Sequence, residues 1–340
     1  MNVVTPGEKL KAKDFASDQE VRWCPGCGDY AILKAVQKTL ADIEATTENT
    51  VFVSGIGCAA RFPYYMSTYG FHSIHGRAPA FATGVKLANP DLDVWVVSGD
   101  GDALSIGGNH LLHLLRRNVD VQFLLFNNEI YGLTKGQYSP TSRAGTRSPS
   151  SPMGSIEHPL SATQFALAAG AKFVARGIDS QQKFLPGLLQ RAHAHKGTSF
   201  VEIFQNCIVY NDGVFDEFTA KAVAADRQIF VEHGKPLLFG AEGNKGLHLN
   251  KDTLQFEATT IGENGVSIDD VQVHDETSRN LATLLAQMDS PGLPVATGIL
   301  YCNPAASYEQ GLAGLTESVK SKEHGDLNAL LRRGHTWTVD

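Results

Sequence analysis

Short apolar runs alternate with helix-like patterns along the first two-thirds of the chain. The buried strands predicted from continuous apolar runs are 50–53, 94–97, 121–126, 171–175 and 199–204. Apolar residues at helical spacing predict helices at 31–43, 77–88, 103–117, 161–169 and 180–195. Because strands and helices alternate, the expected fold is α/β, with a doubly wound parallel sheet covered by helices on both faces.

The two ends of the chain depart from this alternation. Residues 1–22 show little periodicity and are predicted to form an N-terminal arm. The segments expected after about residue 214 are a helical stretch at 214–230, a hairpin at 247–261, a helix near 278–288 and a strand near 294–301. The expected organisation is therefore an α/β domain at 23–213 and a C-terminal α+β extension at 214–340.

Composition narrows the class of protein. The chain has 340 residues, of which 42% are hydrophobic and 19% charged, and its net charge is −7. That charge argues against nucleic acid or an anionic membrane as the main partner. No apolar stretch reaches the roughly 18 residues of a membrane helix, and the N-terminus lacks the apolar core of a signal peptide. A cytoplasmic protein without structural disulfides is expected.

Unusual polar turns follow four of the predicted strands. They are SGIGC at 54–58, SGDGD at 98–102, NNE at 127–129 and QNC at 205–207. In a parallel sheet ligands bind at the carboxyl ends of the strands, so these turns are expected to converge at one edge. A polar loop at 131–158 follows the NNE turn, and a loop of this length is typical of a lid.

Two of these turns carry residues suited to a magnesium diphosphate. Asp100 lies in the GDG run, and a gap of 25 residues separates Gly101 from the asparagine pair of the NNE turn. A carboxylate and the amide oxygen of Asn128 are hard ligands that suit Mg²⁺, and the neighbouring glycines allow a diphosphate to approach the backbone. This arrangement resembles the diphosphate–Mg²⁺ signature of thiamine diphosphate enzymes. The alternative is a pair of ordinary strand-to-helix turns.

The cysteines indicate a metal centre at the same edge. Cys24 and Cys27 form a CxxC, while Cys58 and Cys207 follow the first and last strands of the α/β core. Four thiolates suit a [4Fe-4S] cluster and a structural zinc ion equally well, and a redox-active dithiol is a third possibility. The fifth cysteine, Cys302, is expected to be a buried core thiol.

Together these motifs carry a family resemblance over roughly residues 20–215. The stretches are WCPGCGDYAILKAV, SGIGCAARFPYY, HGRAPAFATGVKLANPDLDVWVVSGDGDALSIGGNHLLHLLRRN and NNEIYGLTKGQYSPTS. In series they resemble the β subunit of 2-oxoacid:ferredoxin oxidoreductases, most closely the 2-oxoglutarate type. One position departs from the family pattern, because Lys135-Gly136-Gln137 stands where the family usually has Gly-Gly-Gln, and this change is expected to alter loop geometry.

The resemblance assigns residues to each cofactor. It implies a [4Fe-4S] cluster held by Cys24, Cys27, Cys58 and Cys207. It implies Mg²⁺ held by Asp100, Asn128 and the backbone carbonyl of Ile130. The other residues expected to contact the cofactor are Ile56, Gly57, Cys58, His75, Gly99, Gly101, Asp102, Tyr131, Gly132, Leu133 and Thr134.

The implied reaction is the coenzyme A-dependent oxidative decarboxylation of 2-oxoglutarate to succinyl-CoA and CO₂, with electrons passed through the cluster to ferredoxin. Pyruvate or a broad range of 2-oxoacids is the alternative substrate. A non-oxidative thiamine diphosphate enzyme subunit with a structural zinc is the alternative from another class, and a metal-bearing interaction module is a third.

The resemblance also implies a partner. Thiamine enzymes use a glutamate on a second, pyrimidine-side domain, and this chain has one α/β domain. In the resembled family that domain belongs to a separate α subunit. We therefore expect an αβ or (αβ)₂ assembly, with the extension at 214–340 packed on the partner.

Two residues are candidates for roles in catalysis. Arg61, three residues after Cys58, could pair with the distal carboxylate of 2-oxoglutarate through a charge-assisted hydrogen bond, or it could be a surface or phosphate-facing arginine. His75 could contact the cofactor or donate a proton near the reacting carbon, or it could be a buried, hydrogen-bonded histidine.

Overall fold

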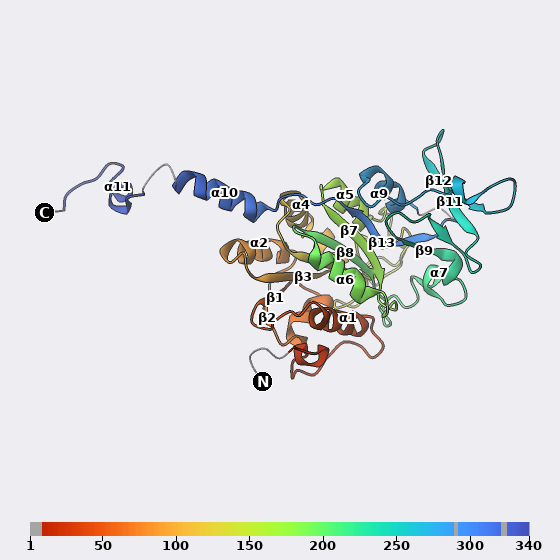
Figure 1. Cartoon of the computed structure of the whole chain (residues 1–340). Helices are drawn as coiled ribbons and strands as arrows, with labels where there is room; N and C mark the ends of the chain where they lie inside the picture. The colour runs from red at the N-terminus through yellow and green to blue at the C-terminus, as the bar shows by residue number, and fades with distance from the viewer. Residues whose placement is uncertain (1–8, 289–291, 321–324, 340) are drawn as a thin grey trace.

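An eight-stranded sheet forms the centre of the protein (Figure 1). The computed structural model describes residues 9–288, 292–320 and 325–339. The strand order is β2-β1-β3-β4-β8-β7-β13-β9. The strands are β1 (Thr50–Ser54), β2 (Tyr69–His72), β3 (Asp93–Gly99), β4 (Gln122–Asn127), β7 (Phe173–Ile178), β8 (Ser199–Phe204), β9 (Gln228–Val231) and β13 (Val295–Cys302). Neighbouring strands are parallel except β13 and β7, so β13 and β9 run opposite to the other six.

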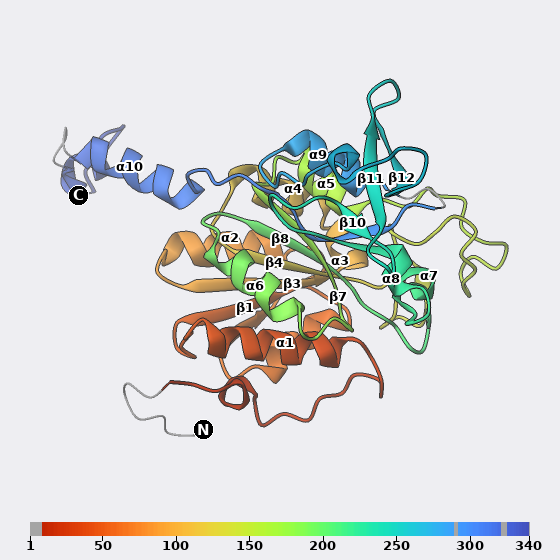
Figure 2. The ribbon, with the colours of Figure 1, turned by 45° about the vertical axis from the view of Figure 1, so that its right-hand side comes forward.

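Helices cover both faces of this sheet (Figures 1 and 2). One face packs against α2 (Ala78–Ala88), α4 (Gly108–Arg117), α5 (Ala162–Ala168) and α9 (Arg279–Ala286). The other packs against α1 (Asp29–Asp42), α6 (Leu185–Ala194) and the 3₁₀ segment η2 (Ala59–Tyr65). Successive strand residues alternate between the two cores, as the period of two requires. The predicted doubly wound α/β fold is confirmed.

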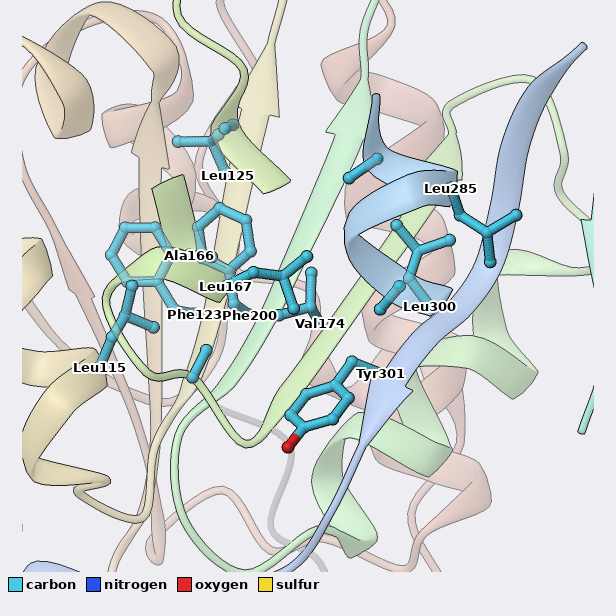
Figure 3. Close-up of a cluster of buried hydrophobic side chains, with 14 of the residues drawn as sticks. Leu115, Phe123, Leu125, Ala166, Leu167, Val174, Phe200, Leu285, Leu300 and Tyr301 are labelled. Carbon is cyan, nitrogen blue, oxygen red and sulfur yellow. The ribbon is translucent and has the colours of Figure 1, made fainter. Parts of the chain in front are cut away.

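Aromatic and branched side chains fill the larger of the two cores (Figure 3). Phe123 of β4 and Phe200 of β8 stack with ring centroids 5.8 Å apart. Leu285 of α9 and Leu300 of β13 belong to the same cluster, although they come from the segment after residue 214. That segment therefore contributes both strands and core side chains to the main sheet.

The prediction of a helix over 214–230 is wrong for most of its length. Only two single turns are helical, α7 (Asp216–Thr219) and α8 (Ala224–Arg227), and β9 follows directly. In β9, Ile229 and Val231 are buried while Phe230 is exposed, which is the period of a strand. The predicted hairpin is confirmed as β11 (Lys245–Asn250) and β12 (Gln255–Thr260), and β10 (Leu238–Phe239) completes that small sheet.

The helix predicted at 103–117 is divided into α3 (Asp100–Leu104) and α4. The break is where the chain at Gly76 approaches Gly107 so closely that a Cβ on Gly76 would lie 2.5 Å from the backbone nitrogen of Gly107. Only glycine permits that approach, and it brings the His75 loop beside the turn after β3. The edge strand β2 was not predicted, because all four of its residues are exposed and they form no apolar run.

The ends of the described chain differ from each other. At the N-terminal end, η1 (Ala12–Phe15) buries Phe15 completely, so the described part of the predicted arm is fixed to the body. At the other end α10 (Tyr308–Lys320) and α11 (Leu327–Leu331), neither of which was predicted, lead away from the sheet (Figures 1 and 2). Residues 1–8 of the arm and 289–291, 321–324 and 340 of the extension lie outside the described residues. Among described helices, none combines the length and apolar character needed to cross a membrane.

Asn118 joins α4, β8 and the chain before α10. It ends α4 in the left-handed conformation, with φ of 55°. Its Oδ1 accepts from the backbone nitrogen of Thr198 at 3.1 Å, and its Nδ2 donates to the carbonyls of Ala305 and Ala306 at 3.2 Å. One side chain therefore satisfies backbone groups from two distant segments.

Replacing Asn118 is expected to destabilise the fold by two separable amounts. Asn118→Gly removes the hydrogen bonds and should lower the free energy of unfolding by about 2 kcal/mol. Asn118→Ala also removes the short polar side chain through which asparagine tolerates the left-handed region, and it should lower the free energy of unfolding by about 3 kcal/mol. Urea denaturation followed by circular dichroism measures both values. Equal losses in the two variants would show that backbone conformation contributes nothing here.

Candidate active site

A pocket lies at the carboxyl ends of β1, β3 and β4. The chain leaves β1 towards β2 on one side and returns to β3 on the other, so the strand order reverses here, as at the ligand-binding crevice of open α/β sheets. The pocket is lined by Ile56, Gly57, Cys58, Ala59, His75, Gly99, Asp100, Gly101, Asp102, Phe126, Asn128, Ile130, Tyr131, Gly132, Leu133 and Thr134. Every residue predicted to contact thiamine diphosphate or Mg²⁺ is in this set.

Asp100 is held by the start of the long loop. Its carboxylate is 2% exposed, and the hydroxyls of Ser139 and Thr141 donate to Oδ2 at 2.5 and 2.6 Å. Burial raises the pKa of Asp100, and these two hydrogen bonds oppose part of that rise. Both side-chain donors among the described residues meet the same oxygen, Oδ2, and Asp100 lines the pocket.

The same short turn also holds the asparagine pair. Ser142 donates its hydroxyl to the carbonyl of Glu129, and Thr141 also lies 2.9 Å from Oδ1 of Asn127. The turn Ser139–Ser142 therefore connects the end of β3 to the end of β4, the two places that carry the predicted Mg²⁺ ligands.

Asn128 adopts a defined amide orientation. Its Oδ1 accepts from the backbone nitrogen of Ile130 at 3.2 Å, and its Nδ2 donates to Oε1 of Gln205 at 2.8 Å. An amide oxygen has two lone pairs, so Oδ1 keeps one for a cation. Glu129, between these residues, takes the left-handed conformation with φ of 55°, which makes this tight turn possible.

A buried ion pair supports Asn127 from the core. Arg176 of β7 donates through Nε to Glu202 of β8 at 2.8 Å, and Asn127 donates to the other carboxylate oxygen of Glu202 at 2.8 Å. The guanidinium also donates to the hydroxyl of Thr163 at 2.7 Å. Because each partner is hydrogen-bonded, the buried charges are compensated and the end of β4 is held rigidly.

Asp102 organises the opposite wall. Its Oδ1 accepts from the backbone nitrogens of Ile56 at 3.1 Å and Gly76 at 2.8 Å, and Ser98 donates to Oδ2 at 2.5 Å. The Nδ1 atom of His75 lies 2.6 Å from Oδ1. The carboxylate was predicted to contact the diphosphate, and here its oxygens are also engaged in joining the turns after β1 and β3 to the His75 loop.

Gly101 is required by Tyr131. A Cβ on Gly101 would lie 2.3 Å from the ring of Tyr131, whose hydroxyl donates to the carbonyl of Gly101 at 2.9 Å. The glycine of the GDG motif therefore lets an aromatic ring close the pocket, in addition to admitting a ligand.

The cysteine-bearing segments meet beside this pocket. A Cβ on Gly132 would lie 3.5 Å from Sγ of Cys207 and 3.7 Å from Sγ of Cys58, so both thiols border one residue of the pocket wall. The CxxC segment is joined to them through Trp23, whose Nε1 donates to the carbonyl of Cys58 at 2.8 Å. It is also joined through Gly28, whose backbone nitrogen donates to the carbonyl of Asn206 at 3.2 Å.

The thiols interact electrostatically. Burial, followed by the carboxylate of Asp29, raises the pKa of Cys58 to about 12, and the thiols of Cys207 and Cys24 add to the rise. The same causes raise the pKa of Cys27 well above its ordinary value. Within the described ranges, no three histidine, cysteine, aspartate or glutamate side chains gather around one point as a single metal ion requires.

Arg61 is not among the residues that line the pocket. Its Nε donates to the hydroxyl of Tyr65 at 3.1 Å. The guanidinium lies close enough to Cys58 to lower the pKa of that thiol slightly. Cys302 is half-buried rather than fully buried, and it packs at the edge of the core formed with α1 and α6.

Several site residues were missed from the sequence. They are Asp29, Ser139, Thr141, Ser142 and Gln205. The polar run Ser139–Ser142 gave a weak signal, since it forms the last four residues of a stretch that carries the resemblance. Asp29 is fully buried, and burial raises its pKa to about 7, against a hydrogen bond with Cys27.

Lys135 explains the departure from the Gly-Gly-Gln pattern. The two-residue strands β5 (Ile130–Tyr131) and β6 (Gln137–Tyr138) form a hairpin whose connection includes Lys135 with φ of 77° and Gly136 with φ of 95°. Lysine carries a Cβ into a region where glycine is unstrained, at a cost of about 1 kcal/mol. The hairpin pairs Ile130 with Tyr138 and Tyr131 with Gln137, and an altered loop geometry relative to the family stays a prediction.

The fold and the pocket define a thiamine diphosphate-binding domain. Residues 53–203 match the family model described as thiamine pyrophosphate enzyme, C-terminal TPP binding domain. That segment includes the turns after β1, β3 and β4, whose residues make up the pocket.

Known relatives specify the family. The chain is 48% identical to 2-oxoglutarate oxidoreductase subunit KorB of Mycobacterium tuberculosis, over 99% of this chain and 91% of that protein. It is 37% identical to 2-oxoglutarate synthase subunit KorB of Methanocaldococcus jannaschii, over 67% and 79%. A solved structure of 2-oxoglutarate:ferredoxin oxidoreductase from Magnetococcus marinus, with 2-oxoglutarate, coenzyme A and succinyl-CoA bound, has a TM-score of 0.77 at 33% identity and covers 97% of both chains. The chain therefore belongs to the 2-oxoacid:ferredoxin oxidoreductase β-subunit family, as the motifs predicted.

The hydroxyl of Thr141 is expected to matter for cofactor binding. Thr141→Val keeps the side-chain shape but removes one of the two hydroxyls that donate to Asp100 and the hydroxyl that lies 2.9 Å from Oδ1 of Asn127, so the dissociation constant for thiamine diphosphate should rise about tenfold. Equilibrium dialysis against the αβ complex measures it. Thr146→Val, in the same loop and bonded only to the carbonyl of Arg143, is the matched control. Equal constants for both variants would contradict the role of Thr141.

Proposed function

We propose that the chain is the β subunit of a 2-oxoglutarate:ferredoxin oxidoreductase. It would take part in the coenzyme A-dependent oxidative decarboxylation of 2-oxoglutarate to succinyl-CoA and CO₂, and pass the electrons through a [4Fe-4S] cluster to ferredoxin. The observation that carries this proposal is the position of Gly132, which lines the pocket and borders the thiols of Cys58 and Cys207. An electron donor site and an electron acceptor site would then share one wall.

The oxygen ligands fit a magnesium ion. Asp100 presents Oδ1, Asn128 keeps a lone pair on its amide oxygen, and Ile130 offers a backbone carbonyl from the same turn. All three are hard donors, and Mg²⁺ is bound in proteins by a few such ligands together with phosphate oxygens. These residues would hold the ion, and the turn Ser139–Ser142 would hold them.

The cysteines fit an iron–sulfur cluster. Each thiolate of a [4Fe-4S] site binds a different iron, so the sulfur atoms stand farther apart than around one zinc ion. Cys24, Cys27, Cys58 and Cys207 influence one another electrostatically without forming a compact single-ion site among the described residues. The cluster is preferred to the structural zinc of the non-oxidative alternative because the relatives of this chain are ferredoxin oxidoreductases.

The protein supplies position and shielding for the reaction. Thiamine diphosphate, when bound, supplies the nucleophilic carbon that attacks the 2-oxo group and stabilises the negative charge left by loss of CO₂. Tyr131 closes the pocket over Gly101, and Nδ1 of His75 lies 2.6 Å from Oδ1 of Asp102, so Nε2 would be the nitrogen that acts. In this arrangement His75 would orient a bound group or move a proton at Nε2.

Partner contacts complete the proposed enzyme. An α subunit would carry the pyrimidine-side domain, and the segment 214–340 would pack on it in an αβ or (αβ)₂ assembly. Cys24 is exposed beside an open hollow lined by Cys27, Tyr30 and Asp179, which provides a surface through which ferredoxin could receive electrons. A cytoplasmic location belongs to the same proposal, because a reducing compartment keeps cysteines available as cluster ligands.

Anaerobic co-purification with the neighbouring α subunit tests this function. The complex should be brown, contain iron, and turn over 2-oxoglutarate with coenzyme A and ferredoxin at a higher kcat/KM than pyruvate. The chain alone should be inactive because it has half of the cofactor site. A colourless, zinc-containing complex that decarboxylates without reducing ferredoxin would support the non-oxidative alternative. A higher kcat/KM for pyruvate would refute 2-oxoglutarate as the preferred substrate. Full turnover by the single chain would refute the need for an α subunit.

Arg61 is proposed to bind the distal carboxylate of 2-oxoglutarate. Its place one turn after Cys58 puts the guanidinium near the pocket, at a wall the partner would complete. Arg61→Ala should raise KM for 2-oxoglutarate about tenfold through loss of a charge-assisted bond, and leave KM for pyruvate unchanged. Steady-state assays with both substrates measure this, with Arg61→Lys retaining the charge. Equal effects on the two substrates would refute the assignment.

A further inference from the structure

One buried glutamine contacts both halves of the site. Gln205 follows β8 directly, and its side chain is 1% exposed. Its Nε2 donates to Sγ of Cys27 at 3.3 Å, while its Oε1 accepts from Nδ2 of Asn128 at 2.8 Å. The second Nε2 hydrogen is directed to the carbonyl of Asn206 at 2.6 Å, which fixes the plane of the amide.

Contact with Asn128 determines which end of that amide faces the cation site. An asparagine can present either oxygen or nitrogen, and only the oxygen binds a cation. Since Oε1 of Gln205 is an acceptor alone, it selects the NH₂ group of Asn128 and turns Oδ1 towards Ile130 and the pocket. Without this contact, the orientation of the Asn128 amide would depend only on the hydrogen bond from the backbone nitrogen of Ile130.

Contact with Cys27 bears on the redox properties of the sulfur. An N–H donated to a cluster sulfur stabilises the more negative, reduced state, so it raises the reduction potential. The backbone amide of Asp29 is the other donor that favours the thiolate form of Cys27. Gln205 provides the side-chain donor, from a position that solvent does not reach.

We propose that Gln205 is a positioning residue that orients Asn128 for Mg²⁺ and raises the reduction potential of the cluster through Cys27. The inference rests on the proposed cofactors. It assigns to one side chain a double role, because the same amide determines the geometry of the cofactor site and the driving force for electron removal. No other described side chain donates to Cys27 and accepts from a predicted Mg²⁺ ligand.

Two variants of Gln205 separate the two roles. Gln205→Met has a similar length and removes both hydrogen bonds. Gln205→Glu keeps an acceptor for Asn128 but removes the donor to Cys27. Gln182→Met is the matched control, because Gln182 donates to the carbonyls of Ala31 and Asp179 and contacts neither Cys27 nor Asn128. Each variant is made in the αβ complex and purified anaerobically.

The readouts are the midpoint potential of the cluster, by electron paramagnetic resonance titration with dithionite, and the Mg²⁺ concentration that half-saturates thiamine diphosphate binding. Gln205→Met should shift the potential to more negative values and raise the Mg²⁺ constant about 10-fold or more, as loss of a hydrogen bond to a metal ligand commonly does. Gln205→Glu should shift the potential at least as far and leave the Mg²⁺ constant near that of wild type. Gln182→Met should change neither.

Several results would overturn the proposal. An unshifted potential in both Gln205 variants would refute the role at Cys27, and an unchanged Mg²⁺ constant in Gln205→Met would refute the role at Asn128. If Gln205→Met fails to assemble, Gln205→Glu decides the question. A shifted potential with an unchanged Mg²⁺ constant supports the proposal, and any other combination contradicts it. A wild-type complex without iron would instead refute the proposed cluster itself, and this inference with it.

Discussion

The site depends on keeping one carboxylate, Asp100, buried and correctly oriented at the end of β3. A buried charge is unfavourable unless hydrogen bonds compensate it, and here Ser139 and Thr141 donate to a single oxygen. These hydroxyls come from the long loop. If the loop moved away, the carboxylate of Asp100 would lose both side-chain hydrogen bonds. The loop is therefore part of the pocket wall, and Ser139 and Thr141 attach it to the end of β3.

A network of hydrogen bonds that compensates buried polar groups extends from Asp100 into the sheet. Thr141 also reaches Asn127, Asn127 donates to Glu202, and Glu202 pairs with Arg176 on the neighbouring strand. A chain of satisfied polar groups thus runs from the pocket to β7 across three strands. Such a network is costly if one member is lost, because each remaining group would be buried without a partner. The side chains of this network therefore stabilise one another beneath the pocket.

Much of the site could be predicted from sequence because its residues follow strands directly. Asp100, Asn128, Cys58 and Cys207 each stand at the end of an apolar run, and parallel strands bring such ends together. The serine and threonine hydroxyls that hold Asp100 could not be assigned in this way. They come from an irregular turn about 40 residues later, where no periodicity relates position to orientation. The sequence pattern also took β9 for helix and missed β2. Both are edge strands, and their formation depends on pairing with a strand from another part of the chain.

Lys135 shows how far local strain is tolerated beside this rigid framework. Its left-handed conformation is one that glycine would adopt freely, yet the β5–β6 hairpin keeps the pairing of Ile130 with Tyr138. The hairpin is held on both sides, by the hydroxyl of Tyr131 on Gly101 and by Ser139 on Asp100. These anchors fix the backbone on either side of the turn, so the strain at Lys135 is confined to the exposed tip. A loop held at its base can therefore carry strain at its tip without moving Asp100 and Asn128 beneath it.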